Sequence, residues 1–120
     1  MKKRLVGVAV VVASALVAVS LAFAGSTTLQ LKAATTKLAY NKKTLKAPAG
    51  KVTIVLKNPS VLQHDVAIKI NGKVHKSKLA NKGDTVKLTI RRLRAGTYTF
   101  YCTVPGHAAA GMKGKLVVTK

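Results

Sequence analysis

The sequence of 120 residues contains one cysteine, no tryptophan and only two acidic residues. With Cys102 alone, the chain cannot form an intramolecular disulfide, so a disulfide framework is excluded. Aromatic residues make up 4% of the chain. They leave little to stack on bases, so the composition disfavours nucleic acid as a partner. Against the two acids stand 22 lysines and arginines, and such a balance favours anionic partners.

The first 24 residues have the pattern of an export segment. Basic residues 2–4 precede an apolar run over residues 5–24, which closes on the small-x-small triplet Ala22-Phe23-Ala24. This pattern predicts a signal peptide cleaved before Gly25, leaving one small domain over residues 25–120. The run is also long enough to span a bilayer, so an uncleaved N-terminal membrane anchor is the alternative. In both cases we expect the domain outside the cytoplasm, periplasmic or extracellular, and tethered to the membrane if cleavage does not occur.

Turn signals such as Asn58-Pro59 and Asn71-Gly72 divide the remaining chain into short segments. Val86, Leu88 and Ile90 alternate with polar residues, which is typical of a half-buried strand in an antiparallel sheet. The expected strands cover residues 28–34, 37–40, 44–47, 51–57, 64–70, 73–76, 85–91, 97–102 and 114–119. Several short strands at this spacing predict an all-β sandwich or barrel.

The soft metal ligands gather in the stretch YCTVPGHAAAGMKG, residues 101–114, as C-x4-H-x4-M. Cys102 ends one expected strand, and His107 and Met112 follow before the last strand begins. His64 opens the segment 64–70 on its inward face. If these two strands run antiparallel, Cys102, His107, Met112 and His64 meet at one end of the sandwich. A thiolate, two imidazoles and a weak axial thioether are the ligand set of a mononuclear copper site for electron transfer.

At these residues the chain resembles the plastocyanin-like cupredoxins, the small type 1 blue copper proteins. Their pattern is an early His followed by a late C-x(n)-H-x(n)-M hairpin, and the resemblance spans Thr28 to Val118, including APAGKVTIVLKN and FYCTVPGHAAAGMKGKLVV. It implies a mostly antiparallel Greek-key β-sandwich that binds one copper per chain. The implied metal ligands are His64, Cys102, His107 and, on the long axial bond, Met112.

The resemblance also implies roles around the ligands. His107 would be the electron port, set in an apolar patch formed by Val104, Pro105, Gly106 and Ala108–Ala110. Many family members carry Asn where this chain has Asp65. We expect the Asp65 carboxylate to accept hydrogen bonds from Thr103 and its charge to favour Cu(II), which lowers the reduction potential.

These observations predict an exported one-electron carrier that cycles between Cu(I) and Cu(II) and is not an enzyme. Only three histidines are present, too few for the second copper cluster of a multicopper oxidase, and we expect His75 to be a surface residue. The alternative is a copper protein for storage or delivery on the same fold. A cationic surface-binding module with an empty site is the third interpretation.

The expected partners follow from charge. Removing Lys2, Lys3 and Arg4 lowers the formal charge from +20 to +17. We expect a monomer that meets redox proteins through their acidic docking surfaces. The same charge suits association with an anionic membrane or with envelope polymers.

Overall fold

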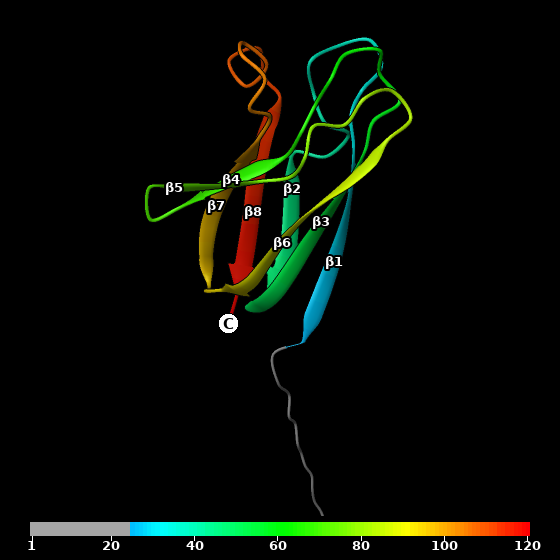
Figure 1. Ribbon diagram of the computed structural model, residues 1–120. Coiled ribbons are helices and arrows are strands. Elements are labelled where there is room, and N and C mark those ends of the chain that lie inside the picture. The colour runs from blue at the N-terminus through cyan, green and yellow to red at the C-terminus, as the bar shows by residue number, and fades with distance from the viewer. Residues whose placement is uncertain (1–24) are drawn as a thin grey trace, which may run out of the picture.

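The computed structural model describes residues 25–120, which form eight strands in two packed layers (Figure 1). The strands are β1 (Ser26–Lys32), β2 (Thr44–Pro48), β3 (Gly50–Lys57), β4 (Ala67–Ile70), β5 (Lys73–Lys76), β6 (Thr85–Leu93), β7 (Gly96–Tyr101) and β8 (Lys113–Thr119). One sheet has the order β1-β3-β6 and the other β2-β8-β7-β4-β5. The pairs β1–β3 and β2–β8 are parallel, and the other four are antiparallel. The expected all-β Greek-key sandwich, mostly antiparallel, is confirmed.

The core lies between the two sheets and follows the alternation of the sequence. Along β3 the burial pattern alternates, so that Val52, Ile54 and Leu56 point inward and are at most 1% exposed. From the facing sheet, Phe100 and Leu116 are fully buried. Completely burying a side chain of this size contributes about 1.5–3 kcal/mol to stability, so these inward rows hold the layers together.

Two expected strands are shorter than the sequence predicts. Segment 37–40 forms only an isolated bridge between Ala33 and Tyr40, and the strand expected over 64–70 begins at Ala67. In residues 64–66 the ladder is incomplete: His64 forms an isolated bridge with Ala80, the Tyr40 hydroxyl donates to the Asp65 carbonyl at 2.6 Å, and the Val66 amide donates to Ser77 Oγ at 3.1 Å. Backbone groups satisfied in this way do not need a neighbouring strand.

The two ends of the sandwich are built differently. The lower pole is the end of the sandwich that lies lower in Figure 1. The ends of both sheets lie there, at the residue pairs Ser26–Lys51, Gly50–Leu93 and Gly96–Val118. At the opposite end, the upper pole, lie the loops before β4 and between β7 and β8 (Figure 1). The strands β4 and β7 are antiparallel, which is the arrangement needed to bring His64 and Cys102 to the same end.

The N-terminal segment expected to be a signal peptide or an anchor, residues 1–24, lies outside the described residues. Within residues 25–120, no helix has the length and apolar character needed to cross a membrane.

Candidate metal centre

The hairpin of β7 and β8 carries the C-x4-H-x4-M stretch to the upper pole. Cys102 follows the end of β7, and its amide donates to the Met112 carbonyl at 3.1 Å. The Met112 amide in turn donates to the His107 carbonyl at 3.0 Å. Gly106 and Gly111 have φ angles of 84° and 117°, a region that glycine adopts without steric cost. These bonds close the loop and hold Cys102, His107 and Met112, the three ligands expected from the sequence, at one end of the hairpin.

The structure brings His64, Cys102 and His107 together. The two Nδ1 atoms lie 3.2 Å apart, and Cys102 Sγ lies 3.6 Å from Nδ1 of His107 and 3.9 Å from Nδ1 of His64. The donor atoms of the three residues lie within 4.8 Å of one another. This triangle of one sulfur and two nitrogens has the donor set of a trigonal His2Cys copper site.

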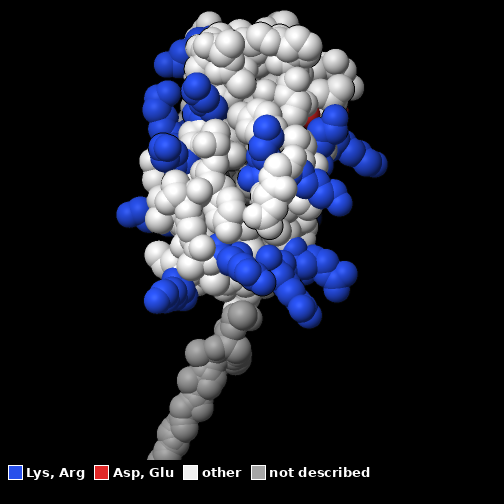
Figure 2. All heavy atoms as spheres, turned by 90° about the vertical axis from the view of Figure 1, so that its left-hand side faces the viewer, with Lys and Arg blue, Asp and Glu red and all other residues white. Residues whose placement is uncertain are grey.

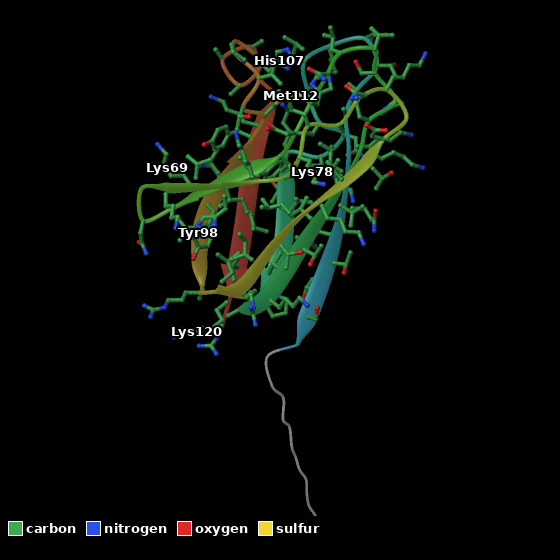
Figure 3. The ribbon with its side chains drawn as sticks, in the orientation of Figure 1. Lys69, Lys78, Tyr98, His107, Met112 and Lys120 are labelled. Carbon is green, nitrogen blue, oxygen red and sulfur yellow. The ribbon has the colours of Figure 1, made fainter. Side chains whose placement is uncertain are left out.

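Met112 lies beside this triangle through its backbone bonds to Cys102 and His107. Its side chain is fully buried, and Figure 3 shows Met112 just below His107 at the upper pole. A buried thioether on the loop that carries the thiol and one imidazole matches the placement expected for a weak axial ligand.

Burial sets the protonation of the triangle. His64 is 0% exposed and Cys102 1%, whereas His107 is partly exposed. Burial lowers the pKa of His64, with a further lowering by His107, and burial raises the pKa of the Cys102 thiol. Nδ1 of His64 faces the other two donor atoms, and Nε2 is buried without a hydrogen-bond partner. A soft cation fits this set, because it would stabilise the thiolate and take the ring nitrogens as neutral donors.

Asp65 connects the two segments that bear the site. Its Oδ1 accepts from the Thr103 amide at 2.7 Å, and its Oδ2 accepts from the Thr103 hydroxyl. The expected bonds between Asp65 and Thr103 are confirmed. They fix the residue after His64 to the residue after Cys102, and so hold the two segments in register.

Tyr40 provides a third fixing point that the sequence did not reveal. Its hydroxyl donates to the Asp65 carbonyl, and its ring packs against Phe100 with centroids 5.5 Å apart. Burial first, and then the nearby Cys102 and Asp65, raise the pKa of Tyr40. The hydroxyl therefore stays protonated as a donor. Tyr40 follows an irregular segment, so no periodic pattern pointed to this contact.

The uncharged loop surface over the site is formed by residues 103–112. They include no aspartate, glutamate, lysine or arginine, and Pro105, Gly106, Ala109 and Ala110 are exposed around the partly exposed His107. In the face shown by Figure 2, the top of the molecule is largely free of lysine and arginine. His75 lies elsewhere: it pairs with Ile68 from edge strand β5, is partly exposed, and does not belong to the cluster.

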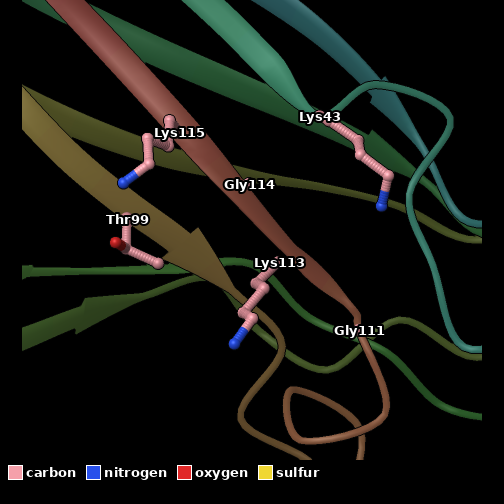
Figure 4. Close-up of a pocket in the computed structure, with 6 residues that line it drawn as sticks. All are labelled: Lys43, Thr99, Gly111, Lys113, Gly114 and Lys115. Atoms are coloured by element: carbon pink, nitrogen blue, oxygen red, sulfur yellow. The ribbon is translucent and has the colours of Figure 1, made fainter.

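A basic groove lies next to the uncharged loop surface, where β8 begins. Lys43, Lys113 and Lys115 line it together with Thr99 (Figure 4). Gly114 also lines it, and a Cβ there would collide with the Phe100 ring and come within 2.6 Å of the Lys43 carbonyl oxygen. Glycine at this position therefore lets β8 pass over Phe100 while keeping the three lysines at the surface.

A two-sheet sandwich with a buried cysteine and two histidines at one pole defines the class of small blue copper proteins. The family model described as "Copper binding proteins, plastocyanin/azurin family" matches residues 27–119. The chain belongs to this family, and its cofactor is copper.

Individual relatives agree with this assignment. Auracyanin-A of Chloroflexus aurantiacus is 32% identical over 123 residues, covering 78% of this chain and 75% of that protein. The solved structure of auracyanin A, described as a "blue" copper protein, has a TM-score of 0.71 and 32% identity, and the match covers 79% of this chain and 100% of that one. Dithionite-reduced auracyanin from Roseiflexus castenholzii has a TM-score of 0.71 and 26% identity, covering 82% of this chain and all of that one.

Proposed function

We propose that this chain is an exported one-electron carrier that holds a single copper through His64, Cys102, His107 and Met112. The observation that carries the proposal is the buried triangle of Cys102 Sγ and two imidazole Nδ1 atoms, all within 4.8 Å. Bound copper supplies the chemistry, a one-electron couple between Cu(I) and Cu(II). The protein holds the ligands, excludes water and presents one edge of the site to a partner.

The residues around the triangle keep it in place. Cys102 and Met112 are joined through backbone bonds, and Asp65 binds Thr103 through both carboxylate oxygens. Packed interiors resist displacement of their side chains. Ligands held in this way move little when the charge of the site changes by one, which keeps the cost of reorganisation low and favours rapid transfer.

His107 is the electron port of this proposal. Of the four proposed ligands, His107 alone is partly exposed, whereas the other three are buried. The uncharged loop surface of residues 103–112 lets a partner approach His107 closely without removing water from charged groups. The fit between a small apolar contact and a short-lived encounter supports a carrier that must release each partner quickly.

Storage or delivery of copper is less well supported. Transfer of the metal itself requires ligands that a second protein can reach and replace. Here His64, Cys102 and Met112 are at most 1% exposed. The burial of these three residues therefore favours a copper ion that is retained while electrons are exchanged, over a copper ion that is delivered to another protein.

The partner in this proposal is a redox protein with an acidic docking surface, met by a monomer. The groove beside the uncharged loop surface carries three lysines, Lys43, Lys113 and Lys115. Their positive charge attracts such an acidic surface toward His107. Replacing all three by Gln should slow electron exchange with an acidic redox protein and weaken its dependence on salt. Rates that depend equally on salt in both proteins would remove the groove from the proposal.

The first test is a titration with Cu(II) followed by visible absorption and reversible voltammetry. We expect one equivalent to give an intense thiolate-to-copper band and a single one-electron wave. Cys102→Ser should abolish the band, and Met112→Leu should keep copper but raise the potential. His75→Gln is the matched control and should change neither. A band that survives Cys102→Ser would contradict the ligand assignment, and a band without a reversible wave would favour storage.

A further inference from the structure

All three arginines of residues 25–120 lie together at the lower pole. Arg91 and Arg92 directly precede the last residue of β6, and Arg94 lies in the turn to β7. Lys51 is the second residue of β3, and Lys120 follows β8 at the same end, where Figure 3 labels it. All five side chains are exposed. Figure 2 shows lysine and arginine side chains gathered along this end, on the opposite side of the sandwich from His107.

An irregularity in β6 creates part of this cluster. Val52 pairs with Ile90 and Gly50 with Leu93, so the single residue Lys51 lies opposite two residues, Arg91 and Arg92. Strict alternation from Ile90 would turn Arg92 toward the core. The bulge instead exposes both arginines in succession and returns Leu93, 2% exposed, to the interior. Bulges commonly re-aim side chains at functional positions.

This arrangement is costly for the fold itself. Like charges on facing residues of a strand pair destabilise a sheet, and here Lys51 faces two arginines. The two acids of residues 25–120 lie at the other end: Asp65 follows His64, and Asp84 precedes β6, where its carbonyl accepts from the Asn58 amide. No acidic side chain of the described residues compensates these five cations, so they are available to attract an anionic surface.

We propose that the lower pole, formed by Lys51, Arg91, Arg92, Arg94 and Lys120, docks on a bilayer surface rich in anionic phospholipid. Guanidinium groups bind phosphate through paired N–H donors, and several cations near an anionic surface add their attractions. The five cations come from both sheets and spread over one end of the sandwich, which suits a flat surface. This inference goes beyond electron carrying and does not depend on it.

The course of the chain agrees with this orientation. The described chain enters at Gly25, and Ser26 pairs with Lys51, so residues 1–24 join the domain at the lower pole. An uncleaved anchor would hold this same end against the membrane. The docked protein would then present His107 to solvent, because the β7–β8 loop lies at the far end of the strands (Figure 1).

The test is sedimentation of the copper-loaded domain, residues 25–120, with lipid vesicles at physiological ionic strength. The match to the solved Roseiflexus castenholzii relative covers 82% of this chain and all of that one. A domain of the extent of residues 25–120 therefore folds alone. Vesicles of phosphatidylcholine with phosphatidylglycerol are compared with phosphatidylcholine alone. A soluble anionic polysaccharide serves as the competing partner. Visible absorption and the melting temperature verify that each variant is folded.

Two variants remove the same charge from opposite ends. Arg91→Gln, Arg92→Gln and Arg94→Gln together should weaken vesicle binding on the order of 100-fold, since each cation near the surface contributes about a factor of five. Lys43→Gln, Lys113→Gln and Lys115→Gln together should change it by less than about threefold. Lys113 and Lys115 lie six and four strand residues from Thr119, about 20 and 13 Å, which is beyond the screening length of about 8 Å.

Each other outcome overturns the proposal. Equal losses in the two variants would show that binding follows total charge and has no docking face. Unchanged binding in the arginine variant would place the lipid contact elsewhere. Binding to the polysaccharide but not to the vesicles would assign the pole to an envelope polymer. None of these results bears on the copper titration, so the two proposals fail separately.

Discussion

The two poles of this sandwich solve opposite physical problems. At the upper pole, titratable and polar groups are buried, hydrogen-bonded to one another and covered by the uncharged loop surface. At the lower pole, five cations are exposed, Lys51 faces two arginines, and no acidic side chain of the described residues lies among them. A metal centre needs fixed, dry ligands, whereas attraction over a distance needs exposed charge. A domain of under 100 residues can meet both requirements, because the length of its strands separates the two ends.

The largest expected difference between the poles is in packing. Phe100→Ala removes a fully buried ring that contacts Tyr40 and lies beneath Gly114, and it should lower the free energy of unfolding by about 3–5 kcal/mol. Arg94→Ala, at the exposed end, should change it by less than about 0.5 kcal/mol. Chemical denaturation of both variants measures the contrast. Similar losses would mean that the lower pole is as tightly constrained as the upper.

A second contrast concerns pH. Because burial lowers the pKa of His64, the unfolded chain binds a proton more readily than the metal-free fold. Stability is therefore fully present above the ordinary histidine pKa of about 6.5 and falls as the pH drops below it, by at most about 1.4 kcal/mol per unit.

Thermal unfolding of the metal-free protein between neutral and mildly acidic pH measures this loss. His64→Gln should flatten the profile, and His75→Gln, the matched control on β5, should leave it unchanged. A profile that His75→Gln flattens instead would place the responsible histidine outside the site.

The two aspartates offer a finer test of the upper pole. Asp65 is 1% exposed and bonded to Thr103 beside the site, whereas Asp84 is exposed. Asp65→Asn should raise the reduction potential, since it removes a buried negative charge that favours Cu(II). Asp84→Asn removes the same charge from water and should have a much smaller effect. Voltammetry of both variants decides, and equal shifts would show that Asp65 acts only through total charge.

The smallest expected effect is at the bulge. Arg92→Thr relieves the repulsion between β6 and Lys51 and should stabilise the protein by about 0.2–1 kcal/mol at low salt. The gain should shrink as salt rises, because exposed charges are screened. Denaturation at low and high ionic strength measures both values. A loss of stability would mean that the Arg92 stem packs on the domain.

Periodicity and ligand spacing predicted the sandwich, the β7–β8 hairpin and the approach of His64 to Cys102, because alternating burial and strand direction follow directly from local pattern. The bonds between Asp65 and Thr103 were predicted from the family resemblance instead, because this position joins the two ligand segments in the family. The Tyr40 bond, the late start of β4 and the bulge at Arg91 and Arg92 were not predicted. Each depends on a partner distant in sequence, or on a shift in register that leaves no mark in the local pattern.

The placement of His107 and of Gly25 at opposite ends has one more consequence. Any surface that holds the lower pole keeps the proposed electron port about one strand length away, on the order of 20 Å. In the proposed docked orientation, electrons would leave at that height above the membrane and pass to molecules whose own redox group reaches it. The proposal thus makes the sandwich a spacer that sets the distance from the membrane at which redox partners bind.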